Sequence, residues 1–335
     1  MNSNNCAFLA DSKRQQSNET DSLKTLRLRY VKHLASTLGI SNDTIIALAE
    51  NTSQYYRTFN RDVKGKNRKL VEATGRLKKI QRRILDDILL RLPPSESSFG
   101  QAKGRTIKDN AKVHVHSKYI VKLDIKDFYP SIHSTKVYKF FVDKQLCSPD
   151  VAHILTALTT YDYALPLGTS TSPMLADLIV RPLDIRINGI AKKVGLKYTR
   201  YVDDLTLSGS FSLERVTNLV IKILNQSGFK TKKEKLIYYK PMQLDEERVI
   251  TGVRIDNGLI SVPLDYVGAL KAELKSAVFQ SRRSKVKGLF KPREHYRGKI
   301  TYVKWLDLKL GQELISLYRK VKWRHIEWAS SKIQE

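Results

Sequence analysis

Residues 196–207 read Leu-Lys-Tyr-Thr-Arg-Tyr-Val-Asp-Asp-Leu-Thr-Leu, and this stretch decides the fold. Its pattern predicts a β-hairpin that turns at Val202-Asp203-Asp204. Two adjacent carboxylates repel each other by about 1 kcal/mol in water, and by more where they are partly buried. No Lys or Arg lies between Tyr201 and Ser210, so we expect a cation from elsewhere to balance the charge. The alternative is a plain Asp-Asp turn in a loop.

A third carboxylate, Asp124, follows the run Ile120-Val-Lys-Leu. This run predicts a buried strand over residues 119–125, with Asp124 at its end, where a side chain can face a cleft. Carboxylates on neighbouring strands form a hard-oxygen site suited to Mg²⁺. Two such ions about 4 Å apart lower the pKa of an attacking hydroxyl and neutralise a leaving pyrophosphate. The pattern therefore indicates nucleotidyl transfer.

Charge is the strongest feature of the composition. The 335-residue chain has 60 Lys and Arg against 33 Asp and Glu, a formal net charge of +27. Such a balance indicates a polyanionic partner. An anionic membrane is the alternative, but the basic residues are spread through the chain rather than confined to one amphipathic helix. Nucleic acid is therefore expected, and a membrane is not.

The remaining composition favours a folded protein of a reducing cytoplasm. The hydrophobic fraction of 41% is enough for a packed core. No apolar run approaches the length of a membrane span, and the N-terminus does not have the pattern of a secretory signal. Cys6 and Cys147 have no metal-ligand spacing, which fits a reducing compartment.

The rest of the chain alternates helical and strand patterns, which predicts an α+β fold. From residue 22 to about 49 the pattern is helical, with Ser41 as N-cap of a short helix over residues 42–50. Residues 97–110 are rich in turn-forming residues, and 165–173 read as a loop. Further helices are expected over 76–92, 135–146, 174–193 and 213–227 and from 264 to the end. Further strands are expected in a hairpin around Lys64-Gly65-Lys66, and over 236–239 and 249–255.

Three segments resemble the palm motifs of reverse transcriptases. Residues 124–132 (Asp-Ile-Lys-Asp-Phe-Tyr-Pro-Ser-Ile) resemble the first motif. Residues 165–173 (Leu-Pro-Leu-Gly-Thr-Ser-Thr-Ser-Pro) resemble the second, and residues 201–204 (Tyr-Val-Asp-Asp) the third. The third motif alone is weak evidence, but three motifs in this order and about forty residues apart are specific.

The resemblance implies a right-hand polymerase with an antiparallel palm sheet and a helical, basic thumb. Residues 1–20 would be a polar lead-in, and 21–118 would form N-terminal helices and the fingers. The palm would cover 119–256, and the thumb, with RNA recognition, 257–335. The implied activity is RNA-directed DNA synthesis from dNTPs with two Mg²⁺ ions.

Carried over by motif, Asp124 and Asp203 would bind both metal ions, and Asp204 would assist. Tyr129 matches the steric gate that excludes a 2′-hydroxyl; a core tyrosine is the alternative. Leu167 and Gly168 match the stretch that packs on the incoming nucleotide, although many viral relatives have glutamine in place of the leucine. Lys235 falls in the fourth motif, where a lysine protonates pyrophosphate. Neighbouring lysines at 230, 232 and 233 leave the acting residue open.

Two further segments resemble signatures of retron reverse transcriptases. Asn110-Ala111-Lys-Val-His114 matches their NAxxH element, and Ile250-Thr251-Gly252 matches their VTG element with Ile for Val. For His114 alone, a structural histidine is as good an interpretation. Retron membership would imply priming from a guanosine 2′-hydroxyl of a structured non-coding RNA (msrRNA). The product would be msDNA, and an effector protein would take part in anti-phage defence.

The basic C-terminal region is predicted to bind RNA through phosphates and stacking. The alternative is a solvated thumb helix. Of the tryptophans, Trp305, Trp323 and Trp328 are expected to pack the thumb, with Trp323 as the best candidate for stacking. The predicted RNA-binding residues are Arg282, Arg283, Lys285, Lys287, Lys291, Arg293 and Arg297, with Tyr296 among them as a stacking residue.

Two other functions stay open. One is a defence-associated, abortive-infection type of reverse transcriptase that works without a retron RNA. The other is a catalytically silent RNA-binding scaffold. The three mutually repelling carboxylates argue against the scaffold, because a degenerate polymerase has no reason to keep them.

Overall fold

The computed structural model describes residues 28–63, 65–143, 147–241, 247–256, 258–282, 286–287 and 291–327. Helices and antiparallel strands are mixed along these residues, as the predicted α+β class requires. The chain forms two compact units. Unit 1 comprises Met1–Gly104, Leu123–Leu205 and Glu214–Leu236, and unit 2 comprises Arg105–Lys122, Thr206–Leu213 and Ile237–Glu335. No helix in the described ranges has both the length and the apolar character that crossing a bilayer needs.

A four-stranded sheet with the order β4-β5-β3-β6 carries the predicted motifs. Strand β3 is Tyr119–Asp124, so Asp124 ends it as predicted. Strands β4 (Lys197–Tyr201) and β5 (Asp204–Gly209) flank the predicted turn at 202–204. Strand β6 (Ile237–Tyr239) pairs antiparallel with β3. Burial on both faces of β3 places Ile120, Val121 and Leu123 in the core.

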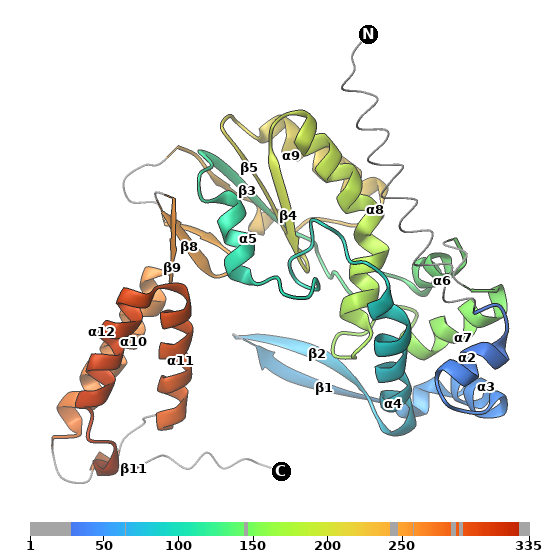
Figure 1. The fold of residues 1–335 in the computed structure, drawn as a ribbon, viewed down its shortest axis with the longest axis horizontal. Helices are drawn as coiled ribbons and strands as arrows, with labels where there is room; N and C mark the ends of the chain where they lie inside the picture. The colour runs from blue at the N-terminus through green and yellow to red at the C-terminus, as the bar shows by residue number, and fades with distance from the viewer. Residues whose placement is uncertain are drawn as a thin grey trace. The chain divides into compact units, whose positions relative to one another are not determined.

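The predicted basic hairpin in unit 1 is confirmed. Strands β1 (Tyr56–Val63) and β2 (Lys66–Ala73) pair antiparallel, from Tyr56 opposite Ala73 to Val63 opposite Lys66. Figure 1 shows them as a long two-stranded ribbon. The turn needs a glycine because Gly65 has a φ of +72°. Its N–H donates to Oδ1 of Asp62 at 2.8 Å.

Unit 1 also contains helices. The longest, α8 (Ser172–Lys193), packs against β4, α6 and α9, and Figure 1 shows α8 and α9 beside β4. Its start is set by Pro173 at the first turn, where the missing N–H costs nothing. The other helices are α2 (Val31–Thr37), α3 (Asn42–Glu50), α4 (Gly75–Arg83), α6 (Ser134–Asp143), α7 (Pro149–Thr159) and α9 (Glu214–Gln226). Short helical turns lie at η1 (Thr52–Tyr55), η2 (Ile84–Ile88), η3 (Leu89–Arg91) and η4 (Lys233–Lys235).

In unit 1 one expected helical region is shorter than predicted, one helix has its predicted bounds, and one helix was missed. Of the helical pattern expected from residue 22 to about 49, residues 22–27 lie outside the described residues. The first helix is shorter than the pattern suggests, because α2 ends at Thr37 and the chain turns at Gly39, with φ +60°. Helix α3 has the predicted bounds, and Ser41 Oγ accepts from the N–H of Thr44. Helix α7 was not predicted, although Ser148 as N-cap followed by Pro149 is a start signal.

Unit 2 combines a small sheet with three thumb helices. Helix α5 (Ile107–His114) packs against strands β7 (Arg248–Ile250), β8 (Val253–Asp256) and β9 (Leu259–Ser261). Figure 1 shows the helices α10 (Leu264–Gln280), α11 (Arg293–Leu306) and α12 (Leu308–Lys320) side by side. Two short segments, β10 (Val286–Lys287) and β11 (Ile326–Glu327), pair parallel near η5 (Trp323–His325).

Two sequence predictions in unit 2 are wrong. The strand expected over 249–255 is two strands, β7 and β8, joined by a turn at Thr251 and Gly252, both with positive φ. Residues 107–110, expected among turns, begin α5. That helix starts with a capping box in which Thr106 and Asp109 satisfy each other's backbone N–H groups.

Candidate active site

Asp124 is held at the end of β3 by two lysines. The residue is 2% exposed, and its Oδ1 lies 2.7 Å from Nζ of Lys232. Lys235 donates to Oδ2. The segment that carries both lysines is fixed beside β3, because Lys126 N–H donates to the carbonyl of Lys230 and Lys232 N–H to that of Asp124. The fourth-motif lysines that reach the carboxylate are therefore Lys232 and Lys235.

The turn between β4 and β5 places Asp203 beside the same strand end. Val202 has a φ of +58°, which reverses the chain. The N–H of Ile125 donates to the carbonyl of Asp203 at 3.0 Å. Burial raises the pKa of Asp203, and the negative charge of Asp124 raises it further, while Lys235 and Lys232 oppose the shift. The hydrogen bond to Asp124 raises the pKa of Lys235, with smaller effects of Asp204 and Asp203. Lys235 thus interacts with all three predicted carboxylates.

Asp124, Asp203 and Asp204 have the donor chemistry for a divalent metal ion. Carboxylate oxygens are the ligands that Mg²⁺ prefers. Oδ1 of Asp124 is buried and accepts no hydrogen bond, since its close contact with Lys232 lacks hydrogen-bond geometry. Over the described ranges, however, no three His, Cys, Asp or Glu side chains lie close enough to form a metal centre. The ammonium groups of Lys232 and Lys235 balance the negative charge of Asp124.

A buried network beneath the turn was missed in the sequence. Arg200 on β4 is 1% exposed. Its Nε and Nη2 donate to Asp184 at 2.7–3.1 Å, and Nη2 also donates to Asp177 at 2.8 Å. Nη1 donates to the carbonyl of Val202 at 3.1 Å, so the guanidinium binds the turn itself. Burial disfavours its charge, but the two carboxylates outweigh burial and raise the pKa of Arg200.

A sequence signal for this network exists. Asp177 and Asp184 are seven residues apart, which places them on one face of the predicted helix 174–193, among apolar residues. Their partner could not be identified, because nothing local in the sequence pairs that face with Arg200.

The residues predicted to contact the nucleotide lie in unit 1. Tyr129 is near the turn at 202–204, and Leu167 and Gly168 belong to the loop 165–173. Burial and the charge of Asp203 raise the pKa of Tyr129 to about 12, so its phenol is protonated at neutral pH. The carbonyl of Leu167 accepts from the N–H of Val71 at 2.8 Å. Gly168 has a φ of +123°, and a Cβ there would lie 2.9 Å from the carbonyl oxygen of Val71. The loop therefore lies close against β2, and this approach requires glycine.

The two signature segments in unit 2 contact each other. Asn110 Nδ2 donates to Oγ1 of Thr251 at 3.3 Å. Ala111 and Ile250 are both fully buried in the same apolar core. His114 shares a hydrogen bond of 2.7 Å with Oγ of Ser208, a contact that fits a structural histidine. Gly252 completes the β7–β8 turn with a φ of +79°.

The basic C-terminal region is only partly as predicted. Arg282, Lys291, Arg293 and Arg297 are exposed. Arg283, Lys285, Trp328 and the side chain of Lys287 lie outside the described residues.

The stacking expected of Tyr296 is wrong, whereas the packing expected of Trp323 is confirmed. Tyr296 is 2% exposed and cannot stack on a base. Trp323 packs against Tyr296 and Tyr318, with its Nε1 donating to the Tyr318 carbonyl. Trp305, at 43% exposed, is the accessible tryptophan of the two.

Comparisons with known proteins found a matching family and several similar proteins. The model of the family "Reverse transcriptase (RNA-dependent DNA polymerase)" matches residues 60–268. The chain is 29% identical to the retron Ec86 reverse transcriptase of Escherichia coli, over 90% of this chain and 94% of that one. It is 30% identical to the retron Mx65 reverse transcriptase of Myxococcus xanthus, over 85% of this chain and 70% of that one. A solved telomerase from Candida albicans has 11% identity and a TM-score of 0.47, with coverage of 78% of this chain and 56% of that one.

The chain belongs to the reverse transcriptases, the family of RNA-directed DNA polymerases. Within that family it is of the retron type, because its similarity to several retron enzymes extends over most of its length. As in the family generally, its chemistry uses divalent metal ions and its template is RNA.

Proposed function

We propose that the enzyme copies a structured non-coding RNA, its msrRNA, into msDNA, starting from the 2′-hydroxyl of a guanosine in that RNA. The contact between Asn110 and Thr251 supports this retron-specific function, because it joins the two retron signatures into one structural element. The likeness to the retron Ec86 enzyme over 90% of the chain supports it independently.

The proposed reaction is two-metal nucleotidyl transfer at Asp124, Asp203 and Asp204. The observation that carries it is the hydrogen bond from Ile125 N–H to the Asp203 carbonyl, which brings the turn to the strand end. Two Mg²⁺ ions, held there by the carboxylates, would activate the attacking hydroxyl and stabilise the leaving pyrophosphate. Lys235 would supply a proton to the pyrophosphate. When the metal ions bind Asp124, both Lys235 and Lys232 would be released from its carboxylate.

The proposed dNTP site comprises Tyr129, Leu167 and Gly168. A phenol ring next to the carboxylates would leave no room for a 2′-hydroxyl on the incoming nucleotide. The close packing of Gly168 on β2 supports a flat surface, on which a base pair could lie. This site would lie in the palm, which is proposed to cover residues 119–256.

RNA recognition is proposed for the basic thumb, where Arg282, Lys291, Arg293 and Arg297 are exposed. A bacterial cytoplasmic location, an effector protein and a role in anti-phage defence complete the proposal.

Sequencing the nucleic acid that co-purifies with the protein tests the retron function. The protein should be expressed together with the DNA that flanks its gene, so that a cognate RNA is present. A branched RNA–DNA hybrid is expected. An untemplated or protein-linked DNA polymer would instead indicate the abortive-infection type. RNA without DNA, together with no metal-dependent incorporation of dNTPs, would indicate a silent scaffold.

A further inference from the structure

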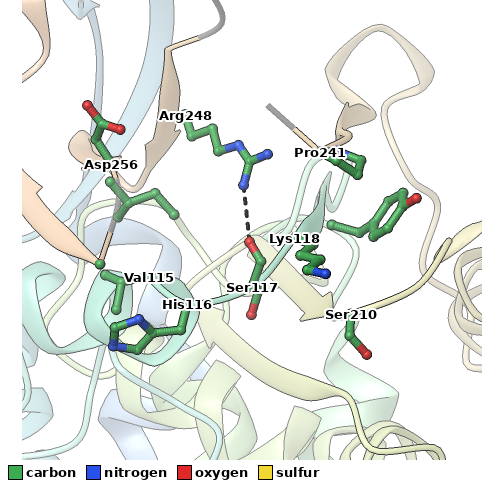
Figure 2. A pocket seen from close by; sticks show the side chains of 11 residues that line it. Val115, His116, Ser117, Lys118, Ser210, Pro241, Arg248 and Asp256 are labelled. Carbon is green, nitrogen blue, oxygen red and sulfur yellow. Dashed lines mark hydrogen bonds between the residues drawn. The ribbon is translucent and has the colours of Figure 1, made fainter. Parts of the chain in front are cut away.

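A cavity of about 600 Å³ lies wholly within unit 2. Residues 115–119, which follow α5, form one wall, and the strands β7 and β8 with Ser210 and Pro241 form the others. Its volume is in the range of pockets that hold small ligands or parts of larger ones. Figure 2 shows Arg248 reaching toward Ser117, with Lys118 nearby. No function has been assigned above to these residues.

Arg248 is a buried cation with an unused donor. It is 9% exposed, and Nη1 donates to the Ser117 carbonyl at 3.1 Å. Nη2 donates to the Lys240 carbonyl. Its Nε is buried without a hydrogen-bond partner. Among the residues that the structure describes, no carboxylate forms an ion pair with Arg248. Burying a guanidinium with only neutral acceptors is unfavourable, and an anion would relieve it.

Lys118 adds a positive charge to the cavity, and His116 adds a ring that can donate a hydrogen bond. Lys118 and His116 are both exposed on the wall formed by residues 115–119. The acidic lining residue is Asp256, and its Oδ2 already accepts from Nη2 of Arg254 at 2.9 Å. The cavity therefore offers charged donors to an anion, with little carboxylate charge to oppose it.

We propose that this cavity binds a phosphate group of the RNA strand that the enzyme copies. Nε of Arg248 and the ammonium of Lys118 would donate to the phosphate oxygens, and His116 would lie at the edge. Phosphate contacts of this kind position a strand without reading its sequence. The net charge of +27 favours a polynucleotide over a small anion. The identity of the strand rests on the proposed function, whereas the anion site itself does not.

The test measures the affinity of the full-length protein for a single-stranded polyuridine RNA as a function of salt, without dNTPs. Lys118→Gln and His116→Gln are the primary variants, because both side chains are exposed and their loss should leave the fold intact. Lys222→Gln, exposed on α9 in unit 1, removes the same charge elsewhere. We expect Lys118→Gln to weaken binding and to reduce the slope of log affinity against log salt by about 0.7, the value for one phosphate contact on a single strand. His116→Gln should have a smaller effect in the same direction.

Equal slopes for wild type, Lys118→Gln and Lys222→Gln would overturn the proposal. Competition by inorganic phosphate at constant ionic strength is a second arm. Displacement of the RNA from wild type but not from Lys118→Gln would support a strand phosphate in the cavity. Phosphate that binds in a Lys118-dependent manner without displacing the RNA would show a site for free phosphate and overturn its assignment to the strand. Arg248→Lys, which keeps the charge but loses Nε, should weaken RNA binding if its thermal unfolding stays cooperative. Because polymerisation is not measured, failure here leaves the catalytic proposal standing.

Discussion

Asp124 shows how a carboxylate can be buried at the end of a strand in this enzyme. Two ammonium groups from one segment, Lys232 and Lys235, lie against its oxygens. A divalent ion bound by the same carboxylate would compete with both lysines. The same two lysines therefore balance the charge of Asp124 and, in the proposed mechanism, would lie near the phosphates of a substrate.

Arg200 is the residue on which the geometry of the Tyr201–Asp204 turn depends. Its guanidinium joins Asp177 and Asp184 of α8 to the Val202 carbonyl. Because both carboxylates are 1% exposed, an unpaired charge there has no access to water.

We predict that Arg200→Lys lowers the free energy of unfolding by about 3–5 kcal/mol, the usual cost of breaking a buried ion pair. A lysine cannot make the forked contacts to two carboxylates and a carbonyl. DNA synthesis should fall as well, since the turn loses its support. Denaturant unfolding and primer extension measure the two effects. Arg186→Lys, exposed on the same helix as the carboxylates, is the control, and equal stability of the two variants would contradict this role.

At the scale of elements, α5 and the β7–β8 hairpin pack together as one unit. The hydrogen bond from Asn110 to Thr251 crosses between them, and the apolar core beside it includes Ala111, Ile250 and Val253. Both signature segments therefore have a shared structural role in unit 2.

A double-mutant cycle should detect this contact. We expect Asn110→Ala and Thr251→Ala to show a coupling of about 0.5–1.5 kcal/mol in unfolding free energy, the net value of one hydrogen bond. Strain at Thr251, where φ is +47°, is present with either residue at position 110 and cancels in the cycle. Asn110→Ala combined with Thr301→Ala, on α11, is the matched control. Coupling no larger than in the control would show that the signatures are not joined energetically.

Elements with strong local signals were predictable from the sequence. The turn at 202–204, the hairpin at Gly65 and the N-cap at Ser41 all rest on patterns within a few residues, and the structure has each of them. The strand expected over 249–255 failed because its apolar residues continue through the turn, and the turn was hidden in Thr251-Gly252.

The parts of the site that involve distant residues were harder to predict from the sequence. That Asp124 and Asp203 come together followed from motif order, but the ion pair with Lys232 did not. The Arg200 network joins residues up to 23 positions apart, with no periodicity to reveal it. Burial of Tyr296 depends on how three helices pack, which local patterns do not specify.

At the scale of the whole molecule, a strongly basic chain holds a small acidic site. The charge of +27 supplies sequence-independent attraction to RNA, while the carboxylates of unit 1 are proposed to supply the chemistry. Binding and catalysis should therefore be separable by substitution.

The most direct test of the central claim replaces Asp203 and Asp204 together by asparagine and measures DNA synthesis on an RNA template with Mg²⁺. The matched control is Asp86→Asn with Asp87→Asn, an adjacent pair that changes the charge equally on η2. We predict that the site variant loses DNA synthesis by about a thousandfold or more, because the metal ions contribute several kcal/mol to the reaction. It should bind RNA as tightly as the control does, and the control should retain synthesis. DNA synthesis that persists in the Asp203→Asn, Asp204→Asn protein would contradict the account.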